Sequence, residues 1–128
     1  MTPEQIAVCR KRFDQVWPFL EEAMLTYGET HSKEDIWALI ESQKAALWPM
    51  DGTAAMLTTV EKYPSGLTEA NVWLAGGDID EIRRWEPVIE DFCKSHGCTR
   101  SVIKGRRGWL RALKGYREVA TIMIKDFV

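Results

Sequence analysis

The sequence has few of the residues that build disulfide-bonded or metal-bound folds. It contains three cysteines and two histidines among 128 residues. Cys9, Cys93 and Cys98 form neither a Cys-x-x-Cys pair nor a zinc-ligand spacing. The odd number of cysteines and the polar beginning of the chain predict free thiols, no signal peptide and a cytoplasmic location. We therefore expect a fold that needs neither disulfides nor a metal ion.

Long apolar runs, low-complexity segments and internal repeats are also absent. No run approaches the roughly 20 apolar residues that cross a bilayer, so we expect no membrane partner. The composition, 45% hydrophobic and 28% charged, is that of a globular domain. The length fits one domain over residues 1–128, with a helical part at 3–44 and a sheet-forming part at 45–128.

Two helices are predicted in the first part of the chain. Thr2 and Gln5 form a capping box before a helical apolar pattern that Gly28 ends. Pro18 lies inside that pattern and is expected to kink or divide the helix. Ser32 caps the second helix, which should fade near residue 43.

The second part predicts strands and further helices. "AALW" is a short strand, and a hairpin runs from about Gly52 to Gly76. A third helix follows, then the strand "CTRSVIKG", the short helix "GWLRALKG" and a final strand, "YREVATIMIKDFV". This order, α, α, β, β, β, α, β, α, β, indicates an α+β or mixed α/β sheet.

Alternation and helical spacing also predict which side chains are buried. In the second hairpin strand, Ala70, Val72 and Leu74 share one face and Asn71 and Trp73 the other. Asp78 caps the third helix, with Glu81 placed for a capping box and Gly97 as the stop. The buried stripe of this helix is expected to comprise Ile79, Ile82, Trp85, Val88, Ile89 and Phe92. Of the six tryptophans, Trp37, Trp73 and Trp85 are expected to be largely buried.

Positive charge gathers in one stretch, "SVIKGRRGWLRALKGYR", residues 101–117. It holds six basic residues and no acidic one, although the whole chain carries a net charge of −2. A phosphate-bearing ligand, a solvated surface and a docking surface for an acidic partner all fit this pattern. The acidic remainder argues against nucleic acid as the partner, and it favours orientation against another protein or a second copy.

The order of elements and several short motifs resemble the GNAT fold, that of the Gcn5-related N-acetyltransferases, over about residues 52–127. "EANVWLAGG" resembles the central strand of the family, and "GCTRSVIKG" resembles the strand beside it. "LKGYR" resembles the family's Gly–aromatic step, with Gly115 and Tyr116 in that place. The resemblance implies a central, mostly antiparallel sheet with two splayed strands and flanking helices.

The resemblance also implies a cofactor, acetyl-CoA, and an amine or protein acceptor. By position, the pantetheine would lie on Val72, Trp73, Leu74 and Ala75 and the pyrophosphate at Gly76 and Gly77, with Arg106, Arg107 and Arg111 near the phosphates. Glu69 is the first candidate for a general base and Glu61 the second. Tyr116 is the candidate proton donor to the leaving thiolate.

Three departures from the family pattern bear on catalysis. The Gly-rich phosphate loop is missing, and the third helix opens instead with the carboxylates of Asp78, Asp80 and Glu81. Arg111 occupies the place of the usual general-acid tyrosine. An asparagine that often follows the fifth strand is replaced by "GRRG". The sequence thus leaves open an N-acetyltransferase and a catalytically degenerate relative.

A third functional hypothesis comes from the similarity of two sequence segments to other proteins. "HSKEDIWALIESQKAALWP" and "VWLAGGDIDEI" look similar to small GNAT-like proteins encoded by tailed phages and prophages. This likeness implies a bacteriophage origin. The function that it implies is that of a non-enzymatic virion or assembly component, which would bind phage structural proteins or a second copy of itself.

Overall fold

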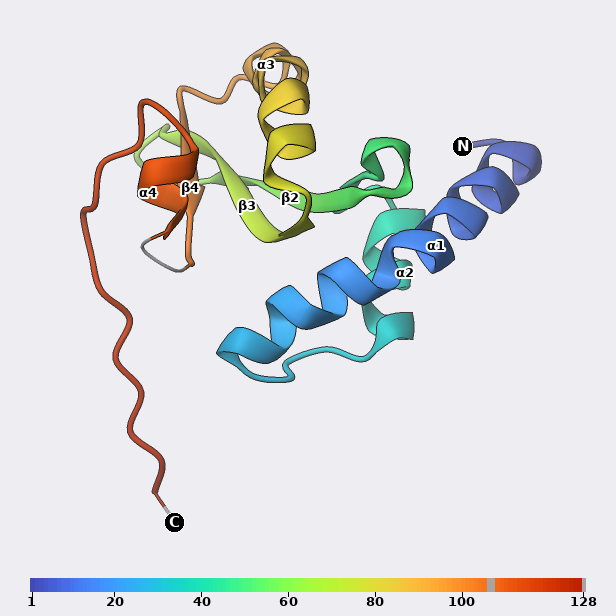
Figure 1. Ribbon diagram of the computed structural model, residues 1–128. Coiled ribbons are helices and arrows are strands. Elements are labelled where there is room, and N and C mark those ends of the chain that lie inside the picture. The colour runs from blue at the N-terminus through green and yellow to red at the C-terminus, as the bar shows by residue number, and fades with distance from the viewer. Residues whose placement is uncertain (106–107, 128) are drawn as a thin grey trace.

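The computed structural model describes residues 1–105 and 108–127 (Figure 1). In chain order, the elements are α1 (Pro3–Tyr27), α2 (Lys33–Glu41), β1 (Ala46–Trp48), the 3₁₀ turn η1 (Met50–Gly52), β2 (Ala54–Lys62), β3 (Thr68–Gly77), α3 (Ile79–Ser95), β4 (Arg100–Ile103) and α4 (Gly108–Ala112). They follow the predicted order except at its end.

The strands form one mixed sheet in the order β1-β2-β3-β4. The first three strands are antiparallel neighbours, and β4 runs parallel to β3 after the crossover through α3. In Figure 1, α3 lies above the sheet while α1 and α2 lie below it. The predicted α+β class, with a mostly antiparallel sheet and helices on both faces, is confirmed.

A β-bulge at Trp73 divides β3 into two registers. Leu57 of β2 pairs with Leu74, but the next residue, Thr58, pairs with Val72. The extra residue reverses the alternation of side chains, so that Val72 packs toward α3 and Leu74 toward α1. The prediction that Leu74 shares a face with Val72 is therefore wrong, because alternation was extended through a residue without a partner on β2.

The predicted helix caps are confirmed at α1 and α2. The side chains of Thr2 and Gln5 and those of Ser32 and Asp35 form reciprocal capping boxes. Pro18 lies within α1 and does not divide it, and α1 ends at Gly28, whose φ of +143° is in the region that favours glycine. The local sequence thus sets where these helices begin and end.

The start of α3 differs from the prediction. Asp78 caps the helix by accepting a hydrogen bond from the amide of Asp80 at 2.9 Å. Glu81 does not complete a capping box, because its side chain is buried and accepts a hydrogen bond from Trp85 Nε1 at 3.1 Å while pairing with Arg84. A carboxylate predicted at the helix terminus therefore belongs to the core side of α3.

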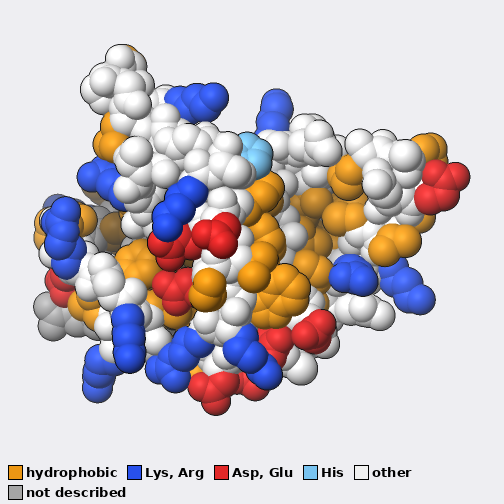
Figure 2. Space-filling view, turned by 90° about the horizontal axis from the view of Figure 1, so that it is seen from above, with side chains coloured by type: hydrophobic (Ala, Val, Ile, Leu, Met, Phe, Trp, Pro, Cys, Tyr) orange, Lys and Arg blue, Asp and Glu red, His pale blue; other side chains and the backbone are white. Residues whose placement is uncertain are grey.

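The buried stripe of α3 is also rotated from its predicted position. Val88 is 51% exposed and Phe92 36% exposed, whereas Cys93 is buried. The view from the side of the molecule that bears α3 shows apolar side chains at the surface among charged ones (Figure 2). Trp37 is buried as predicted. Trp85 is only half-buried, because it lies at the edge of this stripe with its indole N–H directed to the neighbouring Glu81.

The predicted final strand is wrong for the described residues. Residues 116–127 pair with no strand, and Figure 1 shows this segment running away from the sheet to the C-terminal end. Its β-branched composition favours an extended backbone, but a strand also needs a neighbour to satisfy its backbone groups. The sheet therefore ends at β4.

Candidate functional site: a notch between two parallel strands

The two parallel strands stay together for only four residues. β4 pairs with β3 from Glu69↔Arg100 to Val72↔Ile103, and then β4 ends. β3 continues to Gly77, still paired with β2 on its other edge. In the part of the chain that the structure describes, no strand pairs with the remaining edge of β3, so the backbone groups of residues 73–77 on that edge have no strand partner.

A cavity of about 310 Å³ lies where the strands separate. Its volume is at the lower end of the range for small-molecule sites, about 300–1,000 Å³. Its walls come from β3, from the end of β4, from α4, from the last turns of α1 and from the C-terminal segment. The lining residues are Val72, Trp73, Ala75, Ile103, Lys104, Gly105, Trp109, Ala23, Thr26, Tyr27, Ile122 and Ile124.

Three of the residues predicted to hold pantetheine line this cavity: Val72, Trp73 and Ala75. Leu74 does not, because the bulge turns it into the core under α1. Trp73 was predicted to be largely buried and is only half-buried, because it lies at the cavity wall. Its ring meets the imidazole of His31 edge-on, with 4.7 Å between ring centres.

Close packing explains why positions 76 and 77 are occupied by glycine. A Cβ on Gly76 would lie 2.5 Å from the carbonyl oxygen of Phe19 in α1. Gly77 has a φ of +102°, and a Cβ there would lie 2.5 Å from the Cα of Ala54. These contacts account for both glycines, and their role at a pyrophosphate stays a prediction.

One cation of the basic stretch lines the cavity among the described residues, namely Lys104. Arg106 and Arg107, both predicted to contact phosphates, lie outside the described residues. Arg111 is exposed in the last turn of α4. Lys104 is therefore the described basic residue best placed to meet a phosphate of a ligand in the notch.

Glu69, the candidate base, lies away from the cavity in a network of its own. It precedes Val72 by three residues, a separation of roughly 10 Å along a strand, and its side chain is buried. Tyr63 Oη donates to one carboxylate oxygen at 2.7 Å, and Arg100 Nε donates to the other at 2.6 Å. These two hydrogen bonds, that of Tyr63 first, lower the pKa of Glu69. Glu69 is thus held ionised and is a weak acceptor of a further proton.

Tyr116, the candidate proton donor, also points elsewhere. It is half-buried, and its Oη donates to Ser101 Oγ at 2.8 Å, beside the beginning of β4. Burial raises the pKa of its phenol above the ordinary value. It does not line the cavity, so the structure brings neither predicted catalytic group to the notch.

The sequence analysis did not predict several residues that line the cavity or contact Glu69. Tyr63 lies at the turn between β2 and β3, and the register of this hairpin places it near Glu69. Thr26, Tyr27 and Trp109 line the cavity from α1 and α4. Only long-range packing brings these elements together, and no local pattern signals it.

Replacing Glu69 by glutamine tests whether its carboxylate is structural. We expect the free energy of unfolding at pH 7 to fall by about 1–3 kcal/mol, because Arg100 loses its anionic partner. The folded-state pKa of Glu69 is lowered, so its contribution is present above the ordinary glutamate pKa and is lost as the pH falls through the folded-state value. Urea titrations of both proteins should therefore converge in acid; an equal difference at pH 7 and pH 3 would contradict this role.

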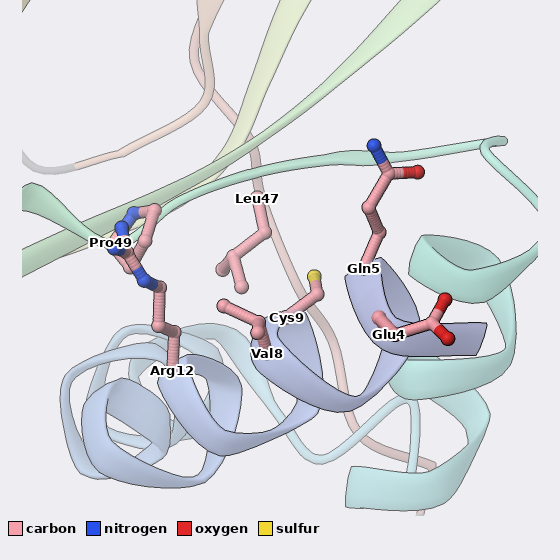
Figure 3. A pocket seen from close by; sticks show the side chains of 7 residues that line it. All are labelled: Glu4, Gln5, Val8, Cys9, Arg12, Leu47 and Pro49. Carbon is pink, nitrogen blue, oxygen red and sulfur yellow. The ribbon is translucent and has the colours of Figure 1, made fainter. Parts of the chain in front are cut away.

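A second hollow, of about 430 Å³, lies between the first half of α1 and β1 (Figure 3). Val8, Cys9, Leu47 and Pro49 give it mostly apolar walls, and Arg12 stands at its edge. Burial raises the pKa of the Cys9 thiol, so its reactive thiolate form is disfavoured. Glu4 and Gln5 also line this hollow, and we do not assign chemistry to it.

Two further searches of the described residues bear on cofactors and membranes. No three side chains among His, Cys, Asp and Glu come together as a metal site in residues 1–105 and 108–127. No helix in these ranges combines the length and apolar character needed to cross a bilayer.

Comparison with known proteins identifies the fold. No family model and no curated protein matches the sequence. An aminoglycoside acetyltransferase from an uncultured soil metagenomic sample, solved with trehalose, superposes with a TM-score of 0.63 at 13% identity, covering 92% of this chain and 89% of the other. The same acetyltransferase with sisomicin gives 0.62 at 12% identity over the same shares. Glucosamine-6-phosphate N-acetyltransferase from Arabidopsis thaliana gives 0.54 at 16% identity, covering 84% and 88%. The chain therefore has the fold of the GNAT acetyltransferases.

Proposed function

We propose that this protein binds an acyl-CoA in the notch between β3 and β4 and acts as an N-acyltransferase with low turnover. The observation that carries this proposal is the unpaired edge of β3, which lies beside a cavity at the point where its parallel partner ends. The fold shared with amine acetyltransferases supports it. An amine acceptor and a cytoplasmic location are parts of the same proposal.

The notch suits the pantetheine arm of CoA. That arm is narrow and carries two amides, which need hydrogen-bond partners when they leave water. The backbone of residues 73–77 on this edge can supply such partners, and Trp73, at the bulge, also lacks a partner on β2. Trp73, Ala75 and Trp109 provide apolar contact for the methylene groups.

The phosphates of CoA would lie toward Lys104. The other end of the notch meets the start of α3, where Asp78 already accepts the amide hydrogen of Asp80. The carboxylates of Asp78 and Asp80 also repel an anion at this terminus, which offsets the attraction of the helix dipole. We therefore place the phosphates on the side of β4 and α4, with Arg106, Arg107 and Arg111 as further candidates.

The expected turnover is low because proton transfer lacks a dedicated group. When bound, acyl-CoA supplies a thioester carbonyl that an amine nitrogen can attack. The carboxylate of Glu69 is engaged by Tyr63 and Arg100, and the phenol of Tyr116 by Ser101. General acid–base catalysis is typically worth 10²–10⁴-fold, so a reaction without it is slow.

Replacing Lys104 by glutamine tests the position of the phosphates. We expect the dissociation constant for CoA to rise about threefold to tenfold at low salt, because one exposed cation is lost and its contribution is screened by added salt. Isothermal titration at two salt concentrations measures this. Lys44→Gln, on an exposed lysine that does not line the cavity, is the control and should bind as the wild type does. Equal affinity for both variants would remove Lys104 from the site.

A second candidate function is a binding or structural module without catalysis. It is favoured by the same engagement of Glu69 and by Arg111 at the usual place of the general-acid tyrosine. A thiol-release assay with a panel of amines separates the two. Saturable turnover that survives Arg111→Ala and is lost in Glu69→Gln would restore Glu69 as the base. The bacteriophage origin and the virion role remain predictions from the similarity of two sequence segments to phage-encoded proteins.

A further inference from the structure

An imidazole lies directly behind the wall of the notch. His31 belongs to the loop between α1 and α2, and its ring meets that of Trp73 edge-on, with 4.7 Å between ring centres. Trp73 lines the cavity, and so does Tyr27, the residue with which α1 ends and after which this loop begins. The loop therefore brings a titratable side chain to the part of the notch that β3 and the end of α1 enclose.

The described wall of the cavity offers no base of its own. Among the described residues that line it, none has a carboxylate or an imidazole, and its charged side chain is that of Lys104. Glu69 lies away from the cavity, and hydrogen bonds from Tyr63 and Arg100 engage both of its carboxylate oxygens. An imidazole changes its charge between about pH 5 and 8, so it can take up a proton and release it again at neutral pH.

One hydrogen bond orients the ring of His31. Its Nδ1 lies 2.8 Å from Oγ1 of Thr30. In the tautomer with the hydrogen on Nδ1, the ring donates to this hydroxyl and Nε2 keeps its lone pair. Nε2 is then the nitrogen that can accept a proton from a ligand.

The charges next to His31 come from the beginning of α2. Asp35, in the first turn of α2, interacts electrostatically with His31. Lys33 is paired with Asp14 of α1 at 3.0 Å, so its charge is already compensated. On the side of β3, the ring contact is with the uncharged Trp73. A carboxylate is therefore the charge that acts on His31, and it attracts the ring once the ring is protonated.

We propose that His31 accepts the proton that the acceptor amine loses, and that the acceptor binds between the loop of residues 28–32 and Trp73. This inference rests on the proposed acyl-CoA site. Phosphates drawn toward Lys104 leave the wall formed by Tyr27 and Trp73 for the acyl group and the amine. The amine nitrogen forms the amide bond in place of the C–S bond, and its proton passes to Nε2 of neutral His31. The imidazolium then returns a proton to the sulfur that leaves, so His31 is regenerated.

The position of His31 agrees with a low turnover. The ring lies behind Trp73 and is not among the residues that line the cavity, so an amine meets it at the rim of the notch. A well-placed general base is typically worth 10²–10⁴-fold. A base at the rim is expected to supply only part of that factor, because catalysis depends steeply on the position of the reacting groups.

The first test locates His31 at the notch without measuring activity. In ¹H–¹³C NMR spectra, assigned with His31→Phe, added CoA should shift the Cε1–H signal of His31 and leave that of His96 in place. His96 follows α3 on the other face of the sheet, where its ring packs on Phe92 with 4.3 Å between ring centres (Figure 1). Bound CoA that leaves the signal of His31 unmoved would separate this residue from the site.

The second test follows thiol release from acetyl-CoA with n-butylamine and with 2-phenylethylamine between about pH 5 and 9. The wild-type kcat/KM should rise with a midpoint equal to the pKa that NMR gives for His31. His31→Phe keeps a ring against Trp73 but has no proton acceptor. It should lose this rise and about fivefold or more of kcat/KM, and it should keep the wild-type melting temperature and CoA affinity. Added imidazole should restore activity to His31→Ala and leave His31→Phe unchanged.

The outcomes distinguish this inference from the proposed function. His96→Phe is the matched control and should keep the wild-type rate and pH profile, because His96 lies on the other face of the sheet. CoA binding together with an unchanged pH profile in His31→Phe would overturn the role of His31 alone. A wild type that CoA does not stabilise against heat would overturn the acyl-CoA site and this inference with it.

Discussion

Replacing Phe13 by alanine is expected to lower the free energy of unfolding by about 3–5 kcal/mol. Phe13 is fully buried under the sheet, between Trp17 and Trp37, with ring centres 5.5 Å away in both pairs. Truncation removes apolar contact and leaves a cavity that α1, held by the sheet and α2, closes only partly. The loss is a large fraction of the total stability of a small domain.

The control for this prediction lies on the same helix. Val8 is 56% exposed, and Val8→Ala should change the free energy of unfolding by less than about 0.5 kcal/mol. Both values come from urea or guanidinium titration followed by circular dichroism. A loss below about 1 kcal/mol for Phe13→Ala would show that α1 does not pack on the sheet as described.

The second large effect concerns the notch. Thr26→Trp is expected to weaken binding of CoA by tenfold or more, equivalent to about 1.4 kcal/mol. Thr26 lines the cavity from the last turn of α1, yet it is exposed and belongs to neither core cluster. An indole at this position therefore adds volume to the wall without disturbing the core, and it occupies space that the pantetheine arm needs.

Leu25→Trp provides the matched control. Leu25 is the neighbouring residue, is 57% exposed and does not line the cavity. Isothermal titration with CoA should give the wild-type affinity for Leu25→Trp and a weakened one for Thr26→Trp, with similar melting temperatures for the two free proteins. Equal affinities would place CoA outside this cavity.

The elements that sequence predicts well are those with local signals. Thr2 with Gln5 and Ser32 with Asp35 mark helix starts through hydrogen bonds within four residues. Turn residues separate β2 from β3, and the order of elements indicates the α+β class. All of these features depend on residues that are neighbours along the chain.

The predictions that fail concern features that depend on residues distant in the sequence. Trp73 forms a bulge because β2 and β3 align in two registers, and nothing in the alternation of β3 marks the change. Residues 116–127 have the composition of a strand, but composition alone does not decide whether a segment pairs with a neighbouring strand. The observed stripe of α3 differs from the predicted one because Glu81, which was assigned to a capping box, and Cys93, which was left out of the stripe, are both buried.

In the candidate site, too, some features could be predicted from the sequence and others depend on long-range contacts. The position of Val72, Trp73 and Ala75 beside a notch follows from the order of the strands. The partners of Glu69 do not, because Tyr63 and Arg100 come from a turn and from β4, up to 31 residues away. Arg106 and Arg107 stay predictions outside the described residues.

Thermal unfolding with and without acetyl-CoA tests the central proposal most directly. A dissociation constant of about 10 µM would mean that 1 mM ligand, about 100-fold above it, stabilises the folded protein by about 2.7 kcal/mol. The melting temperature of a domain this size should then rise by several degrees. We predict that rise for the wild type and for Leu25→Trp, and a clearly smaller one for Thr26→Trp. An unchanged melting temperature of the wild type at 1 mM acetyl-CoA would contradict the account of the notch as an acyl-CoA site.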